Sequence, residues 1–503
     1  MKVRLLHPDR DVDPEDALPP NVDNLTQDLE LEVLFDAMAG GDEFIFKACR
    51  RVVLSSLADP ETITYRQDVV RDCLAHPQMI REVYALTVET LSAEGRIWGG
   101  NSPSTFLHAS VEALQLFLPT LRQLKRISDE HVGSMQSEGL RSFLGMLAGE
   151  LDDLYFAAVD GHLTDLRFRD GVLLSARLGE GNKGDDYVLR RLPHVRQSWL
   201  RRLFARDNWP YSFEVSERDE PGVRALAELR ARGIVLVSSA LKKAADHILG
   251  FLRMLQAELA FYVGCINAHT RLTGNGAVTG FPVPVDPARQ ALSARGLYDP
   301  CLSLRQSRPV VSNDFDADGR SLVMITGLNQ GGKSTFLRSV GLAQLMLQCG
   351  MFVCADSFRA SLCRGIFTHY KREEDPTMRS GKLDEELGRM SDIADLVSPG
   401  SLVLFNESFA STNEREGSQI AREVIRALRE AEIRVVFVTH LFDLAHSLFV
   451  HESGDALFLQ GERQADGRRT FRLVEGDPSP TSHGEDLYWR IFGSASEAAE
   501  VSP

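Results

Sequence analysis

A glycine-rich stretch at residues 327–335 has the residue types and the spacing needed to bind a phosphate group. It fits the pattern G-x-x-x-x-G-K-[ST], in which glycines let successive backbone N–H groups face a phosphate. Lys333 would reach the β- and γ-phosphates of a nucleotide, and the Ser334 hydroxyl would ligate Mg²⁺. A glycine-rich turn can match this pattern by chance. The flanking residues favour a phosphate-binding loop, so the sequence predicts a site for ATP or GTP.

Two regular elements are expected to hold this loop. Residues 321–326 form a short apolar run that predicts a buried strand, and residues 335–349 carry apolar side chains at helical spacing. The helix would begin where the loop ends, so the positive end of its dipole would add to the phosphate site. The pattern therefore predicts a strand, a loop and a helix in that order.

A second apolar run, residues 401–405, ends in Asn406 and Glu407. In most enzymes with a phosphate-binding loop, an Asp at such a strand end holds Mg²⁺ and a following Glu polarises the attacking water. Glu407 occupies the position of this base, and Asn406 occupies the metal position. An amide oxygen adds no negative charge, so we expect a weaker hold on Mg²⁺. The alternative for Glu407 is an ordinary carboxylate at a strand end.

A third apolar run, residues 435–440, predicts another buried strand that ends in His440. At this spacing after Glu407, His440 is predicted to sense the γ-phosphate, although a histidine at a strand end can also be purely structural. A polar loop that contains Thr412 and Asn413 precedes a helix expected at 420–428. That loop is well placed to face a second subunit.

Length and composition indicate an ordinary soluble protein of two to four domains, since it has 503 residues, of which 43% are hydrophobic and 25% charged. We expect no membrane-spanning run and no signal peptide, and therefore a cytoplasmic location. Seven cysteines without C-x-x-C pairs argue against a disulfide framework and a zinc site, and favour buried cysteines. The net charge of −15 disfavours indiscriminate binding of nucleic acid but leaves room for a local basic surface.

Changes of texture along the chain predict its domains. Residues 1–24 are rich in Pro and Asp and are expected to be an extended or frayed lead-in, and residues 25–300 are mainly helical, with a break near Gly233. A β-containing, clamp-like insertion is expected at about 160–215, where Asp170-Gly171 predicts a hairpin turn. Residues 301–503 would form the nucleotide domain.

The most basic segment of the chain lies inside that insertion. Its arginines alternate with tryptophan and phenylalanine, a mixture that suits a surface for phosphates and stacked bases. The alternative is an amphipathic helix with solvated arginines and buried aromatic side chains. The candidate DNA-contacting residues are Arg190, Arg191, Arg196, Arg201 and Arg202.

These motifs resemble those of the MutS family of DNA mismatch-repair ATPases. Residues 326–335 are similar to the family's T-G-x-N-x-G-G-K-S-T loop, and residues 401–417 to its S-L-V-L-L-D-E…T-S-x-x-D-G stretch. Thr439-His440 also matches, residues 481–484 resemble its S-Y-G motif, and residues 57–72 resemble its helical core, where R-Q-x-x-V recurs. The resemblance implies an α/β P-loop ATPase domain of MutS/ABC-like type, attached to a mainly α-helical core or lever domain with a small β-containing insertion.

The resemblance also implies roles for individual residues and a homodimer in which each ATP lies between two subunits. Glu407 would orient water and His440 would sense the γ-phosphate. Ser380, Thr412 and Asn413 would close the partner's site. Phosphates and Mg²⁺ would be bound by Gly327, Asn329, Gly331, Gly332, Lys333, Ser334 and Thr335, with Ser334 and Asn406 as the metal-binding pair.

The sequence departs from the family pattern in two further places. No stretch corresponds to the N-terminal mismatch-reading domain with its F-x-E wedge, so we expect a reduced, MutS-like protein. If Glu386 aligns with the Glu of the family's G-x-S-T-F…E-M segment, then Gly381 and Lys382 replace its Ser-Thr pair. An ABC-like or SMC-like ATPase is disfavoured, because an L-S-G-G-Q signature and long heptad arms are missing.

Two functions remain open from the sequence. The first is an ATP-driven clamp that binds duplex or branched DNA in repair or recombination. The second is a nucleotide-gated module that controls a protein partner, with little turnover and no direct DNA binding. Asn406, the net charge of −15 and the missing wedge domain motivate the second function.

Overall fold

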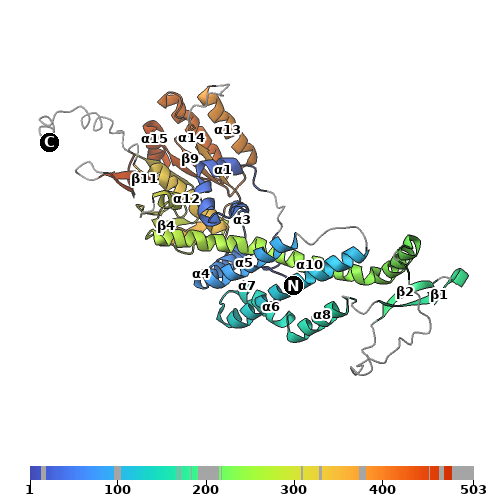
Figure 1. Ribbon diagram of the computed structural model, residues 1–503. Helices are drawn as coiled ribbons and strands as arrows, with labels where there is room; N and C mark the ends of the chain where they lie inside the picture. The colour runs from blue at the N-terminus through green and yellow to red at the C-terminus, as the bar shows by residue number, and fades with distance from the viewer. Residues whose placement is uncertain are drawn as a thin grey trace, which may run out of the picture. The chain divides into compact units, whose positions relative to one another are not determined.

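The chain folds into two compact units whose residues interleave along the sequence (Figure 1). The first unit contains residues 1–3, 81–135 and 141–256, and the second contains residues 4–80, 136–140 and 257–503. The predicted domain boundaries stay a prediction. The computed structural model describes residues 1–12, 18–95, 103–166, 168, 172–182, 184–190, 215–216, 218–306, 310–327, 331–372, 381–452, 454–463 and 469–478.

The first unit is built mainly from long helices. Apolar side chains fill its interior, and the rings of Phe143 and Phe251 stack with their centroids 6.4 Å apart. The hydroxyls of Thr90 and Thr120 lie 2.7 Å apart in the same interior, so each buried hydroxyl has a polar partner. The helices are α5 (Pro77–Glu94), α6 (Pro103–His131), η1 (Val132–Ser134), α7 (Glu138–Glu150), α8 (Asp153–Asp165) and α10 (Glu220–Gly274), of which α5, α7 and α10 also contribute to the second unit.

In the described part of the β-containing insertion expected at about 160–215, two strands form an antiparallel pair. β1 (Leu173–Leu178) pairs with β2 (Gly184–Arg190), and the short turn η2 (Glu180–Asn182) lies between them. A strand at 172–178 agrees with the hairpin signal, and it pairs with the strand that follows it. The expected turn at Asp170-Gly171 lies outside the described residues.

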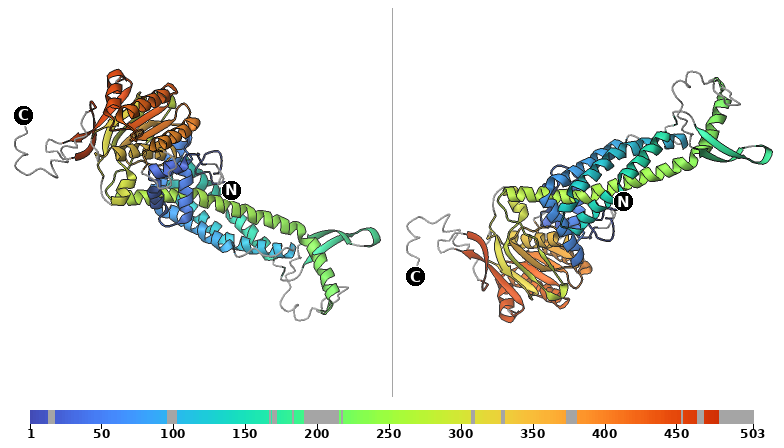
Figure 2. Two further views of the ribbon diagram at one scale, coloured as in Figure 1. Left: turned by 90° about the horizontal axis from the view of Figure 1, so that it is seen from above. Right: turned by 90° about the horizontal axis from the view of Figure 1, so that it is seen from below.

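The longest helix, α10, has 55 residues and continues through Gly233, where a break was expected. A Cβ at Gly233 would lie 2.2 Å from Leu174 Cδ2, so glycine is needed here for close packing and does not end the helix. Figure 2 shows that the N-terminal part of α10 turns away from the rest of the helix.

α10 is also the helix among the described residues that is long and apolar enough to cross a membrane. An 18-residue window of it reaches a mean hydropathy of 1.3, although no such run was expected from the sequence. In the structure, 72% of that window is buried. Such burial is typical of the core helix of a soluble protein.

The second unit contains a six-stranded sheet in the order β12-β11-β6-β10-β9-β8. β11, β6, β10, β9 and β8 run parallel, and β12 pairs with β11 in the antiparallel direction. The mixed α/β fold predicted for this part of the chain is therefore confirmed. The strands are β6 (Leu322–Thr326), β8 (Ile366–Tyr370), β9 (Leu402–Asn406), β10 (Arg434–Val438), β11 (Ala456–Arg463) and β12 (Arg469–Glu475).

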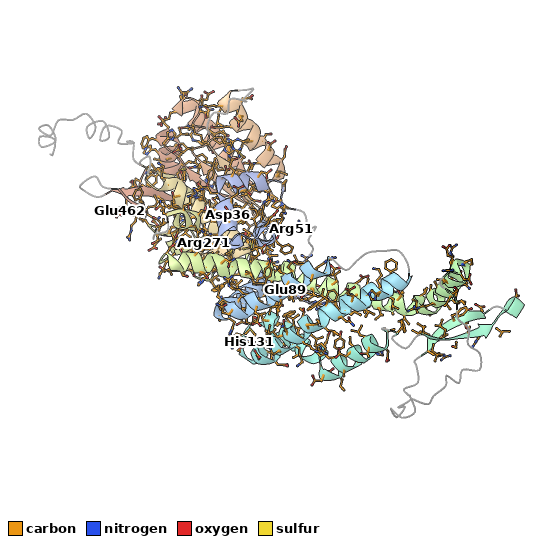
Figure 3. All side chains as sticks on the ribbon, viewed as in Figure 1. Asp36, Arg51, Glu89, His131, Arg271 and Glu462 are labelled. Carbon is orange, nitrogen blue, oxygen red and sulfur yellow. The ribbon has the colours of Figure 1, made fainter. Side chains whose placement is uncertain are left out.

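Helices cover both faces of this sheet, as a parallel sheet with apolar strands requires. α12 (Lys333–Gln348) packs closely on one face, since a Cβ at Gly341 would lie 2.6 Å from Leu404 Cδ1. α13 (Lys382–Leu396), α14 (Glu414–Glu430) and α15 (Phe442–Glu452) supply the core of the other face. Figure 3 shows the side chains that fill these layers. The core between the sheet and α13, α14 and α15 includes Met324, Val403, Phe405, Ala421, Ile425 and Leu444.

A smaller four-stranded sheet and a set of short helices complete the second unit. The sheet has the order β3-β7-β4-β5, with β3 and β7 parallel and the other pairs antiparallel. The remaining elements are α1 (Val22–Asp28), α2 (Leu31–Ala39), α3 (Glu43–Leu54), α4 (Pro60–Ala75), β3 (Val283–Val285), η3 (Pro287–Arg289), β4 (Leu292–Leu297), α11 (Pro300–Gln306), β5 (Asn313–Asp316) and β7 (Ser357–Ser361).

The beginning of the chain is anchored in this unit. Both carboxylate oxygens of the fully buried Glu258 accept backbone N–H groups: those of Leu5 at 2.6 Å, Leu6 at 3.0 Å and Val12 at 3.1 Å. Burial raises the pKa of Glu258 to about 7, although these bonds oppose the shift. Residues 4–12 form no helix or strand, as expected for an extended lead-in, and these contacts hold them in place.

Candidate nucleotide-binding site

Three predicted site segments meet at one edge of the six-stranded sheet. β10 lies between β6 and β9, and the carboxyl ends of parallel strands share an edge. Two backbone hydrogen bonds continue this alignment past the strand ends: Thr439 N donates to Ile325 O at 3.0 Å, and Glu407 N donates to Val438 O at 2.9 Å. The ends of the three strands therefore lie side by side.

The glycine-rich loop needs its glycines for two reasons. Gly327 has φ +109° and Gly332 has φ +90°, in the region that side chains with a Cβ rarely adopt. A Cβ at Gly327 would lie 3.0 Å from the backbone nitrogen of Gly461, and one at Gly332 would lie 3.3 Å from the carbonyl oxygen of Phe471. The β11–β12 hairpin therefore approaches the loop too closely for larger residues.

Ser334 and Asn406 contact each other although 72 residues separate them in the sequence. The Ser334 hydroxyl donates to Asn406 Oδ1 at 2.8 Å. Both are oxygen ligands of the kind that Mg²⁺ accepts. The structure therefore brings the predicted metal-binding pair together, with one neutral amide where a carboxylate is usual.

Lys333 begins α12, and its side chain turns back over the loop. Its ammonium donates to the carbonyl oxygen of Gly327 at 2.8 Å. Burial lowers the pKa of Lys333, and the negative charge of Glu407 partly opposes this shift. Glu407 is half-buried and has φ +55°, which is unusual for a residue other than glycine. Lys333 and Glu407 are therefore close enough to interact electrostatically.

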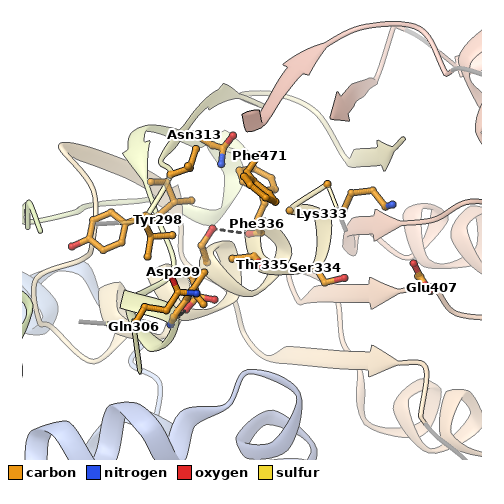
Figure 4. A pocket seen from close by; sticks show the side chains of 17 residues that line it. Tyr298, Asp299, Gln306, Asn313, Lys333, Ser334, Thr335, Phe336, Glu407 and Phe471 are labelled. Atoms are coloured by element: carbon orange, nitrogen blue, oxygen red, sulfur yellow. Dashed lines mark hydrogen bonds between the residues drawn. The ribbon is translucent and has the colours of Figure 1, made fainter. Parts of the chain in front are cut away.

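A cavity of about 610 Å³ opens beside these residues (Figure 4). Gly331, Gly332, Ser334 and Thr335 line it together with Lys333 and Glu407, whereas His440 is not among the described residues that do. In Figure 4, Lys333, Ser334 and Glu407 lie toward one end and Tyr298 toward the other. Apolar side chains also line the cavity, including Leu297, Tyr298, Leu302, Val310, Val311 and Phe471, beside the polar Asp299, Gln306 and Asn313.

Sequence reasoning did not identify most of the residues that line the rest of the cavity. Asn313 begins β5, and its Oδ1 accepts from the backbone N–H of Leu473 at 2.7 Å. Phe471, half exposed with φ +59°, lies where the pairing of β11 and β12 is irregular. The Asn313 contact joins β5 to β12, which are far apart in the chain, and the irregular pairing near Phe471 has no sequence signal.

The loop after β9 rests on two buried polar side chains that the sequence did not mark as site residues. Glu386 on α13 accepts from Phe409 N and from Ser411 Oγ, both at 2.6 Å. His369 on β8 lies 2.7 Å from Ser408 Oγ through its Nδ1. Burial lowers the pKa of His369 to about 4.

Two of the residues predicted to act on a second subunit, Thr412 and Asn413, lie at the start of α14. Asn413 caps α14, since its Oδ1 accepts from Glu416 N at 3.0 Å. Thr412 Oγ1 donates to a side-chain oxygen of Glu416, so both residues support the start of this helix. A role across a subunit interface stays a prediction. Ser380 and Asn329 lie outside the described residues.

Of the five arginines predicted to contact DNA, Arg190 belongs to the described residues. Arg190 ends β2 with an exposed side chain, and its Nε donates to Ser175 Oγ at 2.9 Å. His440 follows β10, and its side chain is exposed at the same sheet edge as Glu407. Arg191, Arg196, Arg201 and Arg202 lie outside the described residues, and their role stays a prediction.

The fold and the site define an α/β protein with a glycine-rich loop and an Asn-Glu pair at one edge of its parallel sheet. The family model for the MutS2 N-terminal domain matches residues 58–275, and the model for MutS domain V matches residues 323–485. Together they match more than half of the chain. The chain belongs to the MutS family of DNA mismatch-repair proteins.

Individual relatives show the same similarity over shorter stretches. The chain is 31% identical over 155 residues to MutS protein homolog 4 of Mus musculus, covering 31% of this chain and 15% of that protein. It is 31% identical over 185 residues to DNA mismatch repair protein MutS of Porphyromonas gingivalis, covering 36% and 20%. It is 37% identical over 139 residues to DNA mismatch repair protein MutS of Clostridium kluyveri, covering 27% and 16%. These matches span a fifth or less of the relatives' own length.

Proposed function

We propose that this protein binds and hydrolyses ATP and uses the nucleotide to control its hold on DNA in repair or recombination. The observation that carries the proposal is the 2.8 Å contact between Ser334 Oγ and Asn406 Oδ1. It joins the end of the glycine-rich loop to the strand end that carries Glu407. A phosphate-binding loop and a water-activating carboxylate at one sheet edge are the two parts that ATP hydrolysis requires.

The residues at this edge fit ATP and Mg²⁺. The positive φ angles of Gly327 and Gly332 and the start of α12 suit a phosphate, since backbone N–H groups and the helix dipole favour an anion there. Ser334 and Asn406 would hold Mg²⁺, which would neutralise charge on the phosphates. The apolar part of the cavity would take the base.

In the proposed mechanism, each chain residue has a separate task. Lys333 exchanges the Gly327 carbonyl for a phosphate oxygen and so binds the β- and γ-phosphates. Glu407 accepts a proton from the attacking water as that water bonds to the γ-phosphorus and the bond to ADP breaks. His440, exposed at the same sheet edge, would sense the γ-phosphate.

We also propose a cytoplasmic homodimer whose helical unit contacts the backbone of duplex or branched DNA. Membership of the MutS family and the relatives named for DNA mismatch repair support DNA binding. The exposed Arg190 supports a contact with phosphates, and the net charge of −15 implies that binding is confined to local basic surfaces. Ser380, Thr412 and Asn413 would face the partner's nucleotide.

The test is filter binding to homoduplex, mismatched, branched and single-stranded DNA, with and without ATP, together with the ATPase rate. We expect at least one DNA structure to change the rate and ATP to change the affinity for that DNA. The salt dependence of binding would count the phosphates contacted. An unchanged rate with every DNA structure, together with no binding at low salt, would overturn the proposal.

Asn406 favours the second candidate, a nucleotide-gated module that controls a protein partner. A neutral amide at the metal position predicts slow turnover, and a slow ATPase can act as a switch. Dimerisation that depends on ATP, with negligible turnover and no DNA affinity, would select this function over the first. Dimerisation with ATP fits both functions, so the ATPase rate and the binding of DNA at low salt separate the two.

A further inference from the structure

A buried carboxylate holds the loop that follows Glu407. The side chain of Glu386 on α13 is 3% exposed, and both of its oxygens accept hydrogen bonds from that loop. Oε2 accepts from the backbone N–H of Phe409, and Oε1 accepts from the hydroxyl of Ser411, both at 2.6 Å. A carboxylate is kept in such a place only if it is well paired, so these two bonds stabilise one loop conformation.

His369 holds the same loop from β8. The imidazole is fully buried, and its Nδ1 lies 2.7 Å from Ser408 Oγ, while Ser408 Oγ donates to the carbonyl oxygen of His369 at 2.6 Å. Its Nε2 lies 3.0 Å from the carbonyl oxygen of Glu386. The ring also stacks on Phe409, with centroids 5.3 Å apart and planes 20° apart. The loop is therefore tied to two elements through Ser408, Phe409 and Ser411.

These contacts fall on a backbone that would not keep its conformation alone. Glu407 has φ +55° and Phe409 has φ +61°, and both are residues with a Cβ in the left-handed region. Such a conformation persists where the surrounding structure holds it, and it is common next to reacting groups. The N–H group and the ring of Phe409 are the parts of the loop that Glu386 and His369 hold.

We propose that Glu386 and His369 are positioning residues that aim Glu407 at the nucleotide site by holding residues 408–411. This inference rests on the proposed ATPase function, in which Glu407 activates water. Glu386 and His369 do not touch the nucleotide in this scheme, so their loss affects the chemical step and leaves ATP binding intact. A residue that only filled the core would affect stability and leave the ratio of kcat to ATP affinity unchanged.

Three variants are compared by two measurements: the rate of ATP hydrolysis and the hydrogen exchange of residues 407–411. E386A removes both acceptors. E386Q keeps the shape, since its amide oxygen can accept from Phe409 N–H and its amide N–H can donate to Ser411 Oγ. D384N removes one exposed charge from the same helix and serves as the matched control.

We expect E386A to lower kcat by about 10- to 100-fold, since a small misplacement of a reacting group has effects of this size. Its affinity for ATP should change by less than about twofold, because the phosphate-binding contacts are intact. Hydrogen exchange over residues 407–411 should accelerate, and exchange over α14 should stay as in the wild type. E386Q and D384N should keep both the rate and the slow exchange.

The outcomes separate this inference from the proposed function. Unchanged loop exchange in folded E386A would overturn the inference whether or not the protein hydrolyses ATP. Faster loop exchange with unchanged kcat would overturn the positioning of Glu407. A wild-type protein that hydrolyses no more ATP than K333A would overturn the ATPase function, and with it the catalytic role of the loop. If E386A does not fold, S411A, which removes one of the two donors, takes its place.

Discussion

The two sides of the candidate site are held by different kinds of contact. On the side of the glycine-rich loop, contiguous residues form most of the geometry: Gly327 and Gly332 supply the backbone conformation, and Lys333 bonds to Gly327. On the side of β9, the residues near Glu407 depend on Glu386 and His369, which come from α13 and β8.

The energies involved show why the second side needs this support. A residue with a Cβ in the left-handed region costs roughly 1–2 kcal/mol, and two such residues, Glu407 and Phe409, lie close together here. A hydrogen bond to a charged group contributes about 1.5–3 kcal/mol, so the two bonds of Glu386 are enough to offset the strain. Glycine avoids most of this cost on the other side.

The largest expected effect is on kcat and comes from a change on the β9 side of the site. Replacing Glu407 with Gln should lower kcat by roughly 10²- to 10⁴-fold, because general-base catalysis contributes that much. ATP binding should stay near the wild-type level. A single-turnover assay and titration with a fluorescent ATP analogue would measure both quantities. Equal losses of affinity and rate would contradict the assignment of Glu407 to the chemical step.

K333A should have the opposite pattern. Loss of the ammonium removes a charge-assisted contact with the phosphates and should weaken ATP binding by roughly 10- to 100-fold, which corresponds to about 1.5–3 kcal/mol. The same fluorescence titration would measure it. Lys382, exposed at the start of α13, provides the control variant K382A, whose affinity should match the wild type.

G332A tests whether glycine conformation holds the loop side. Its φ of +90° and the 3.3 Å approach to Phe471 predict a loss of roughly 1–2 kcal/mol in the free energy of unfolding. Gly388 on α13 has an ordinary φ and open space around its Cβ position, so G388A should stabilise the protein by up to about 1 kcal/mol. Urea denaturation of both variants would measure this, and equal effects would refute the role of the left-handed conformation.

The buried His369 predicts a pH dependence confined to the β9 side. Its pKa in the folded protein is about 4, below the ordinary value of 6.5. The stability it contributes is therefore fully present above pH 6.5 and is lost as the pH falls towards 4. Between about pH 7.5 and about pH 5.5, the stability difference between wild type and H369Q should shrink by roughly 1 kcal/mol. Denaturation at the two pH values measures it, and a constant difference would contradict it.

The smallest expected effect concerns the contact between the two sides. N406D adds a negative charge next to Ser334, so the Mg²⁺ concentration for half-maximal activity should fall at least about threefold. Turnover should also rise if a weak metal site limits the rate. A magnesium titration of the ATPase reaction measures both, and unchanged turnover would refute that explanation of slow hydrolysis.

Much of the fold around the site was predictable from local patterns. The apolar runs at 321–326 and 401–405 became β6 and β9, within one residue at each end, and the run at 435–440 became β10, which ends two residues earlier than expected. Such runs report burial directly, because a strand covered on both faces is apolar throughout. The helix after the glycine-rich loop was predicted for the same reason.

Other features could not be predicted from local patterns of the sequence. The strand at 172–178 pairs with β2, a partner that the turn signal at Asp170-Gly171 did not indicate, and pairing across that turn stays a prediction. Gly233 was expected to break a helix, but it lies inside α10, where Leu174 packs against it. Thr412 and Asn413 support the start of α14, a local use that the sequence did not indicate, and their role at a second subunit stays a prediction. In each case the sequence pattern did not indicate which contact the residues make in the fold.

The sequence by itself determined the glycine-rich loop, its strand and helix, and the Asn-Glu pair, because their chemistry depends on residues that are neighbours in the chain. Only the tertiary structure decided that Ser334 meets Asn406, and that Glu386 and His369 hold the loop after Glu407. The physical reason is that a buried carboxylate or imidazole looks like any other polar residue until the fold supplies its partners and removes it from water.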